Sequence, residues 1–378
     1  MLFPGCLTLE QKLIGVRYRP AGFDYMRLIL SLAVVLSHTI NVCYGRDYTR
    51  DVWNSSWRPV LAFILPMFFV LSGFLVAGSL ERCRTLISFV GLRVLRIVPA
   101  LAVDTFIGAV FLGVLFTTLP LAEYFSNREF FGYFSNIAGS IKYTLPGVFG
   151  ENAWPHVVNS QLWTLPYELE CYAAISLLVL IGVTRRAWLF ILALLIFNVA
   201  LLAWALIHGV GMGAAVSGSP LVECFLFGVA GYIFRRRIYY SAILAVCAFA
   251  ATWLCLASPA GDYLVALPVA YLTIYLGLLE PKRVAWLFRG DYSYGIFLYG
   301  FPVQQSVYAM IGPHSWYVNI LVSLPVILML AVFSWHCVEK PALLLRVNLV
   351  ALEERVQALV ANSPLRVFVR EITLPKMA

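Results

Sequence analysis

Long apolar runs follow one another through most of this chain, and they constrain its fold more than any other feature. Only 12% of the 378 residues are charged, against about a quarter in an average protein, and 61% are hydrophobic. A soluble protein of this size could not bury so much apolar surface. The sequence therefore predicts an all-α fold, a polytopic membrane helix bundle of about ten transmembrane helices. The ten runs cover residues 21–43, 57–79, 97–118, 161–183, 187–208, 218–234, 240–258, 261–279, 290–311 and 317–338.

Basic residues gather in alternate connections between these runs. In a ten-span topology all the clusters lie on one side, which the positive-inside rule makes cytoplasmic. We therefore expect both termini in the cytoplasm and the protein in the cell inner (plasma) membrane. The net charge of +8 follows from this topology, so the sequence predicts no nucleic-acid partner. The clusters are Lys12, Arg17 and Arg19; Arg82, Arg84, Arg93 and Arg96; Arg185 and Arg186; Arg235 to Arg237; and Lys282, Arg283 and Arg289.

Two segments lie outside the predicted bundle. The outer loop 119–160 is rich in Phe, Tyr, Asn and Gly and is long enough to be functional. The tail 342–378 mixes Val and Leu with Arg and Glu, which is typical of a short amphipathic helix on the inner surface. We predict one transmembrane domain over 1–341 and a cytoplasmic tail over 342–378. No Walker-type GxxxxGK[ST] loop occurs, which argues against a primary pump.

Two ionisable residues, Arg27 and His38, lie on the first apolar run, eleven positions apart. A helix rises about 1.5 Å per residue, so they are separated by roughly 16 Å, about half of the hydrocarbon thickness. Ionisable groups in lipid are costly and usually mark function. The simpler alternative is that Arg27 snorkels to the interface and His38 hydrogen-bonds to a neighbouring helix.

A carboxylate, Glu168, falls in the outer half of the fourth run, at a depth similar to that of His38. A carboxylate beside an imidazole orients the ring and stabilises its cation, as general-base catalysis requires. The alternative is a helix-start carboxylate that interacts with the helix dipole after Pro166. Both explanations remain open from the residues alone.

On the inner side, Arg93 and Arg96 lie three residues apart and share one helix face. Paired guanidinium groups bind phosphate well, so they are candidates for a phosphorylated cofactor, although their spacing alone favours ordinary positive-inside arginines. The eight cysteines include no CxxC pair and favour packing over a metal site, so we predict no metal.

Taken together, these segments resemble the acyltransferase-3 family of integral-membrane O-acyltransferases. FDYMR, ten further residues and His38 are similar to the family's opening Asp-x-x-Arg and Arg-x10-His. FFVLSGFL resembles its second-span signature, and RVLRIVP its Arg-x-x-Arg-x-x-Pro motif. LWTLPYELECY is similar to its Trp-Ser-Leu-x-x-Glu-x-x-x-Tyr stretch at Trp163, Leu165, Glu168 and Tyr172. DYSYGIFLYGFPV and VEKPALLL resemble its last two spans.

The resemblance implies an activity. An acyl group, usually acetyl, would move from cytoplasmic acetyl-CoA to a hydroxyl of a cell-surface glycan, a lipid-linked oligosaccharide or a related acceptor. The motif residues Trp163 and Tyr172 would then bind substrate. One position departs from the pattern, because Gly300 stands where many members have His.

The resemblance also implies roles for the ionisable residues. His38 would be the catalytic histidine, Arg27 its basic partner, and Glu168 the family glutamate. Arg93 and Arg96 would contact the phosphates of CoA. The competing hypothesis is a proton-coupled membrane transporter or flippase for a glycan or small molecule, with His38, Arg27 and Glu168 as its proton relay.

Overall fold

The computed structural model describes residues 7–208, 218–258, 260–285 and 287–349, together with 351 and 355. Each of the ten apolar runs contains a helix, so the all-α prediction is confirmed. Within these ranges, β pairing is limited to two isolated bridges, Thr8 with Tyr239 and Thr117 with Val148.

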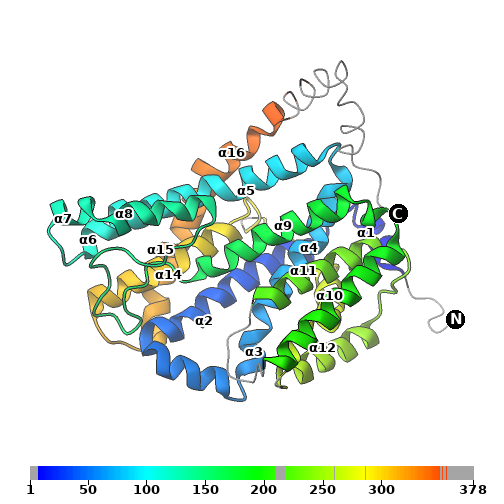
Figure 1. The fold of residues 1–378 in the computed structure, drawn as a ribbon, viewed down its shortest axis with the longest axis horizontal. Coiled ribbons are helices and arrows are strands. Elements are labelled where there is room, and N and C mark those ends of the chain that lie inside the picture. The colour runs from blue at the N-terminus through cyan, green and yellow to red at the C-terminus, as the bar shows by residue number, and fades with distance from the viewer. Residues whose placement is uncertain are drawn as a thin grey trace.

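The longer helices build the bundle and run broadly side by side (Figure 1). They are α2 (Ala21–Asn54), α4 (Ile64–Arg82), α5 (Leu86–Phe106), α9 (Leu165–Leu180), α10 (Ala187–Ile207), α11 (Gly218–Ile233), α12 (Ala242–Leu256), α13 (Ala266–Gly277), α14 (Ser293–Ile311) and α15 (Trp316–Ser334). The shorter ones are α1 (Leu9–Gly15), α3 (Arg58–Ala62), α6 (Gly113–Phe116), α7 (Leu121–Ser126), α8 (Arg128–Tyr133) and α16 (Lys340–Leu344). Single-turn segments are η1 (Ile107–Leu112), η2 (Phe134–Ala138), η3 (Gln161–Thr164), η4 (Val183–Arg185), η5 (Gly261–Tyr263) and η6 (Trp335–Glu339).

Five helical stretches in the described ranges are long and apolar enough to cross a membrane. Helices α11, α12 and α13 are apolar but shorter. Large apolar side chains such as Ile207, Ile243 and Leu254 are exposed on the outside of the bundle, as lipid-facing residues are. The fold is a membrane helical bundle. The five long stretches are Ala21–Asn54, Arg58–Arg82, Leu86–Phe116, Ala187–Ile207 and Trp316–Leu349.

Helix α2 is longer than its apolar run because it bends at Gly45 and continues as 46–54. The backbone φ of Gly45 is 78°, a left-handed value that favours glycine. A Cβ at this position would also lie 2.8 Å from the carbonyl oxygen of Ala153. The bend turns the last part of α2 back under the bundle, where it leads into α3 and α4 (Figure 1).

Helices α4 and α11 cross in close contact. A Cβ on Gly73 would overlap the carbonyl oxygen of Phe225, and one on Gly228 would overlap that of Val70. Small residues allow membrane helices to approach so closely that their backbones touch. This crossing forms part of the main apolar core, which also includes Phe74, Phe225 and Leu226.

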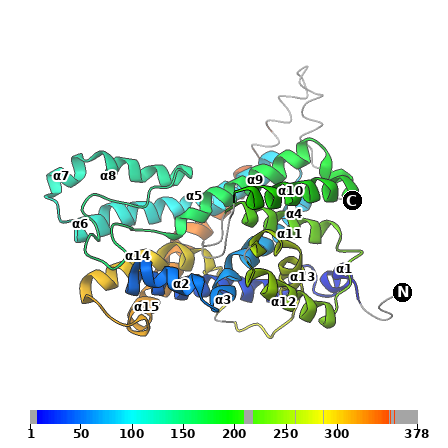
Figure 2. The same cartoon turned by 60° about the horizontal axis from the view of Figure 1, so that its bottom comes forward.

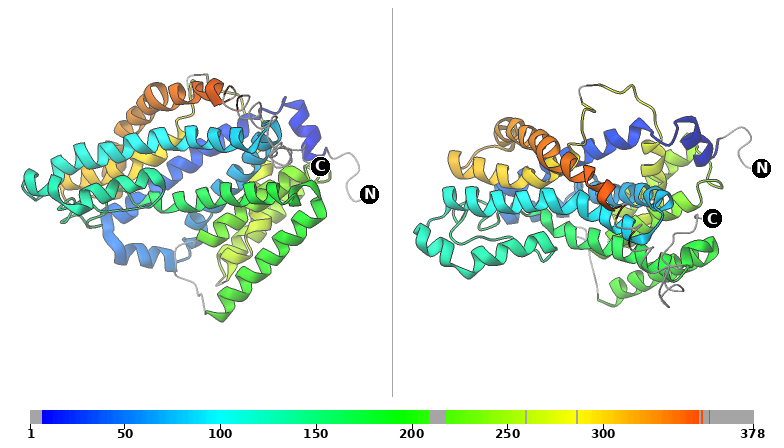
Figure 3. Two further views of the ribbon diagram at one scale, coloured as in Figure 1. Left: turned by 45° about the horizontal axis from the view of Figure 1, so that its top comes forward. Right: turned by 90° about the horizontal axis from the view of Figure 1, so that it is seen from above.

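The loop 119–160 forms a layer at the end of the molecule opposite α1 (Figure 2). Helices α7 and α8 pack beside the far part of α5 and η1, as Figure 3 shows. The hydroxyl of Tyr124 donates a hydrogen bond of 2.6 Å to the carbonyl oxygen of Ala109. Burial raises the pKa of Tyr124 to about 12, so this hydroxyl keeps its proton and remains a donor. The loop is therefore a packed part of the fold.

The opposite end holds α1 and the basic connections. Arg235, at the end of α11, is buried and forms ion pairs with Glu10 of α1 and Glu81 of α4. At the C-terminal side, Leu349 packs against Gly91 of α5. The predicted tail 342–378 begins within α16, and its amphipathic character beyond 349 lies outside the described residues except 351 and 355.

Candidate active site

Two adjoining cavities lie between α2, α4, α5, α9 and α14. The cavity nearer to the layer 119–160 has a volume of about 320 Å³ and contains His38. The second has a volume of about 160 Å³ and contains the arginines of α5. Three residues line both of them, Leu65, Thr164 and Phe297. We call the first the histidine cavity and the second the arginine cavity.

The histidine cavity combines an imidazole with aromatic walls. The ring of His38 meets that of Phe301 edge-on, with centroids 5.4 Å apart. Its nitrogens have no hydrogen bond to any part of the chain that the structure describes, so they are free to bind a substrate hydroxyl. Three indoles, Trp53, Trp154 and Trp163, line the cavity. Trp53 comes from beyond the bend of α2, so both arms of this helix contribute to the walls.

The arginine cavity is lined by Arg27, Arg93, Arg96, Glu168 and Tyr172. Tyr172 donates a hydrogen bond to Glu168, one helical turn earlier on α9. Arg93 donates to the hydroxyl of Ser79 at 2.9 Å and lies over the ring of Tyr172 at 6.0 Å. Among the described residues Arg93 has no carboxylate partner, and its buried Nε has no hydrogen bond.

The other two arginines of this cavity, Arg27 and Arg96, form ion pairs with carboxylates. Arg27 and Arg96 converge on one oxygen of Asp291, with N–O distances of 2.9 and 2.7 Å. Arg27 also pairs with Asp24 at 2.8 Å, one turn earlier on α2. Arg96 reaches the buried Glu339 at 3.5 Å. This group, which we call the Asp291 cluster, joins α2 and α5 to the residues just before α14 and to η6.

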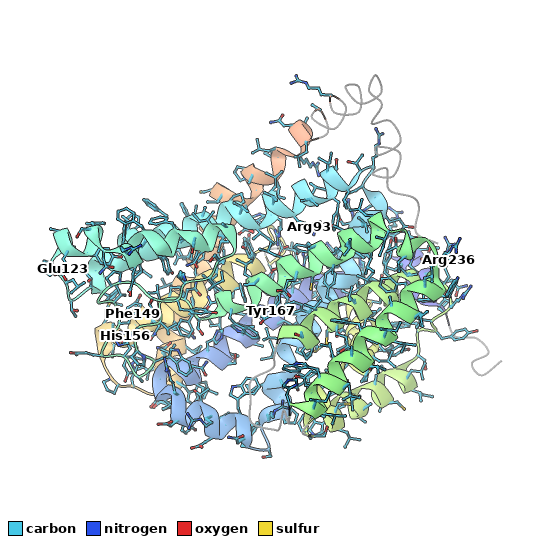
Figure 4. The ribbon with its side chains drawn as sticks, viewed as in Figure 1. Arg93, Glu123, Phe149, His156, Tyr167 and Arg236 are labelled. Atoms are coloured by element: carbon cyan, nitrogen blue, oxygen red, sulfur yellow. The ribbon has the colours of Figure 1, made fainter. Side chains whose placement is uncertain are left out.

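A third cavity opens beside the Asp291 cluster, with a volume of about 280 Å³. It shares Arg27 and Ser293 with the arginine cavity. Its lining holds three arginines, Arg27, Arg283 and Arg289, against two carboxylates, Asp24 and Asp291, so it is basic on balance. Asp24 pairs with Arg283 at 3.2 Å. The three cavities therefore follow one another from the basic connection at 282–289 to the histidine cavity. Figure 4 shows Arg93 between the two ends of the molecule, which are marked by Glu123 and Arg236.

Comparison with known proteins decides the family. The acyltransferase 3 family model, described as an acyltransferase domain, matches residues 21–338. The chain belongs to the acyltransferase 3 family. It is therefore an O-acyltransferase with membrane helices, as the sequence motifs predicted, and the family match favours this enzyme over a transporter or flippase.

Two relatives of this acyltransferase align over nearly their whole length. The chain is 30% identical over 362 residues to nodulation protein 10 of Rhizobium leguminosarum bv. viciae, covering 87% of this chain and 95% of that protein. It is 27% identical over 345 residues to an O-acetyl transferase of Shigella phage Sf6, covering 84% and 94%. A shorter match, 31% over 115 residues, joins 29% of the chain to 28% of nodulation protein NolL of Sinorhizobium fredii. No solved structure matches.

The structure of the acyltransferase divides the expected site residues between the cavities. His38 and Trp163 share the histidine cavity. Arg27, Glu168 and Tyr172 lie in the arginine cavity. Glu168 accepts a hydrogen bond from Tyr172 and lines the arginine cavity, whereas His38 lines the histidine cavity, so the structure does not bring these two residues together.

Several residues of the site were missed by the sequence analysis. Asp291 and Glu339 lie within the motifs DYSYG and VEKP, but their partners are far away in sequence. Gln161, next to the matched Trp163, lines the histidine cavity. At the departing position Gly300, a Cβ would lie 2.8 Å from a methyl group of Val35, so a larger side chain requires Val35 to move.

Proposed function

We propose that this acyltransferase moves an acetyl group from cytoplasmic acetyl-CoA to a hydroxyl of a cell-surface glycan, a lipid-linked oligosaccharide or a related acceptor. The observation that carries the proposal is the series of adjoining cavities, basic at one end and aromatic around His38 at the other. Such a series suits a donor and an acceptor that approach from opposite sides of a membrane.

The proposed orientation follows the charges. Ten helices would cross the inner (plasma) membrane, with both termini and the basic connections in the cytoplasm. The layer formed by 119–160 would then lie outside. Residues 1–341 would form the transmembrane domain and 342–378 a cytoplasmic tail.

On the donor side, the phosphates of CoA would bind Arg283 and Arg289 in the third cavity, beside the Asp291 cluster. Arg93 would bind donor phosphate or carbonyl oxygens in the arginine cavity, because no carboxylate of the described chain forms an ion pair with it. Arg96 lines the same cavity, and Asp291 fixes its direction. The pantetheine arm would carry the thioester to the shared wall of the cavities.

The walls of the arginine cavity would be held in place by Arg27, Glu168 and Tyr172. Arg27 would hold Asp291 in place beside Arg96. Glu168 would fix the hydroxyl of Tyr172 at the wall, where Tyr172 would contact the donor.

On the acceptor side, a sugar ring would pack its C–H face on the indoles of the histidine cavity, including Trp163. His38 would take the proton of the acceptor hydroxyl as the oxygen attacks the thioester carbonyl carbon. The C–O bond forms and the C–S bond breaks. The leaving thiolate then receives the proton from His38, and CoA departs on the inner side.

Replacing His38 with Ala tests the proposal. We expect His38→Ala to abolish transfer of labelled acetate from acetyl-CoA to membrane glycan, because general-base assistance alone is worth about 10²–10⁴-fold. His208→Ala is the matched control, since His208 stacks on Trp204 and lines neither cavity. Substantial transfer by folded His38→Ala would contradict the assignment. Mass spectrometry of glycans from deletion and wild-type strains would then identify the acceptor by the loss of one acetyl group per site.

A further inference from the structure

Pro302 interrupts the backbone hydrogen bonds of α14 next to the histidine cavity. A proline inside a helix has no N–H, so the carbonyl four residues earlier loses its donor. Here that carbonyl belongs to Leu298. In a membrane bundle such a carbonyl must be satisfied by a neighbouring segment.

Two side chains satisfy it, Gln161 at the start of η3 and Asn159 just before η3. Gln161 donates from Nε2 to the carbonyl oxygens of Phe297 at 2.5 Å and Leu298 at 2.8 Å. Asn159 donates from Nδ2 to the same oxygen of Leu298 at 3.1 Å. Carbonyl oxygens only accept hydrogen bonds, so the Gln161 amide is held with its nitrogen toward α14.

This orientation leaves the oxygen of Gln161 as the group available for another contact. The residue is 1% exposed, and Oε1 is buried with no hydrogen-bond partner in the part of the chain described. Gln161 also lines the histidine cavity together with His38. A buried acceptor that lacks a partner is unfavourable, and it is rare in native proteins unless a ligand or water completes it.

We infer that Gln161 binds the acceptor by accepting a hydrogen bond from a second hydroxyl, while the reacting hydroxyl donates to His38. The inference rests on the proposed function. It narrows the acceptor to molecules with a hydroxyl near the one that is acetylated, as in the adjacent hydroxyls of a sugar. A simple alcohol could satisfy His38 but would leave Oε1 of Gln161 unpaired.

The experiment separates binding of the acceptor from binding of the donor. The full-length protein in lipid nanodiscs is given labelled acetyl-CoA and membranes from a strain that lacks this gene, which carry the natural acceptor without its acetyl groups. Each substrate is varied in turn at a fixed concentration of the other. Gln161→Met keeps the length of the side chain and removes the acceptor oxygen. Asn159→Leu is the matched control, because it removes a donor to Leu298 without lining the histidine cavity. It also removes the hydrogen bond from Asn159 to the buried Asp104, so the rates of all variants are compared per folded protein.

We expect Gln161→Met to raise the membrane concentration needed for half-maximal rate about tenfold, the effect of one lost hydrogen bond. The half-saturating acetyl-CoA concentration should stay unchanged, and Asn159→Leu should change neither value. An unchanged membrane requirement in Gln161→Met would overturn the inference, and so would an equal rise in Asn159→Leu. If Gln161→Met aggregates, Gln161→Leu takes its place, since it also removes the acceptor oxygen and its smaller apolar side chain brings no charge into this buried position. Acetyl transfer by the wild-type protein is measured first. No transfer by the wild type would contradict the proposed function, whereas the variants test only the role of Gln161.

Discussion

At the scale of single residues, Asp291 holds two guanidinium groups that arrive from different helices. One of its carboxylate oxygens meets both Arg27 of α2 and Arg96 of α5, and its other oxygen accepts a hydrogen bond of 2.6 Å from Ser293. Charged groups that are largely removed from water are tolerated when each has a close partner of opposite sign. Asp291 therefore allows basic residues to line the arginine cavity without repelling each other.

Replacing Asp291 with Asn should lower the free energy of unfolding, because both arginines lose the carboxylate between them. Arg27 would keep only its pair with Asp24, and Arg96 only its pair with Glu339. We expect a loss of about 1–3 kcal/mol, less than for a fully buried pair since these side chains are partly exposed. The measurement is thermal unfolding of the purified protein in detergent. Asp47→Asn is the control, because the pair of Asp47 with Arg50 is exposed and should contribute nothing measurable. Equal unfolding temperatures for wild type and Asp291→Asn would contradict the role of the Asp291 cluster.

Arg93 gives a prediction for donor binding. Arg93→Gln should raise the KM for acetyl-CoA about tenfold, since one charge-assisted contact to the donor is lost while the fold keeps its other ion pairs. Steady-state rates at varied acetyl-CoA provide the measurement. Arg84→Gln changes the same net charge in the same basic cluster but lines none of the three cavities, and should behave as wild type. A similar KM for Arg93→Gln and Arg84→Gln would remove Arg93 from the donor site.

These residues also mark the limit of sequence reasoning. Arg27 and His38 could be placed on one helix because hydropathy and spacing define depth along a helix axis. Depth does not say which wall of a bundle a side chain faces, so the sequence left open whether Glu168 interacts with His38 or within its own helix. The partners of Arg96 lie 195 and 243 positions away along the chain, and periodicity carries no information on such contacts.

At the scale of helices, the crossing of α4 and α11 depends on the absence of a side chain at Gly73. A Cβ on Gly73 would overlap the backbone of Phe225, and small residues of this kind allow membrane helices to pack closely. The partner helix could not be named from sequence, because several other runs also contain glycine. The bend at Gly45 was also missed, since 46–54 is too polar to belong to the apolar run that precedes it.

Gly73→Leu should prevent this crossing, because even a Cβ would overlap the Phe225 backbone, which cannot move aside as a flexible side chain can. We expect little folded protein, measured as the monodisperse fraction in size-exclusion chromatography after detergent extraction. Gly132→Leu is the matched control, since a Cβ there meets no atom within 4 Å. Normal yield and unfolding temperature for Gly73→Leu would show that the helices can separate without cost.

At the scale of the whole molecule, the two ends differ in character. Glu123 lies in the layer formed by 119–160, and Arg236 lies among the basic connections at the opposite end (Figure 4). The ten apolar runs and the alternation of charge predicted this polarity, and the helices follow each run. The packing of the outer layer was not predicted, because its core of Tyr124, Tyr133 and Phe149 has no regular periodicity.

Cysteine labelling tests the proposed orientation. A membrane-impermeant maleimide applied to intact cells should label Glu123→Cys and leave Arg236→Cys unlabelled, whereas both should react after the membrane is opened with detergent. Both positions are exposed, so burial does not limit either reaction. Labelling of Arg236→Cys in intact cells, or protection of Glu123→Cys, would reverse or refute the orientation. The wild-type protein is the control for its own cysteines.

The wall shared by the histidine and arginine cavities has a consequence for the cell's energy supply. It is formed by Leu65, Thr164 and Phe297, of which two are apolar. Apolar constrictions exclude hydrated ions while they admit small uncharged groups. If acetyl crosses at this wall, the proton gradient and the membrane potential are not discharged by transfer. Only the acetyl group would then leave the cell, while CoA stays in the cytoplasm and the membrane potential is maintained.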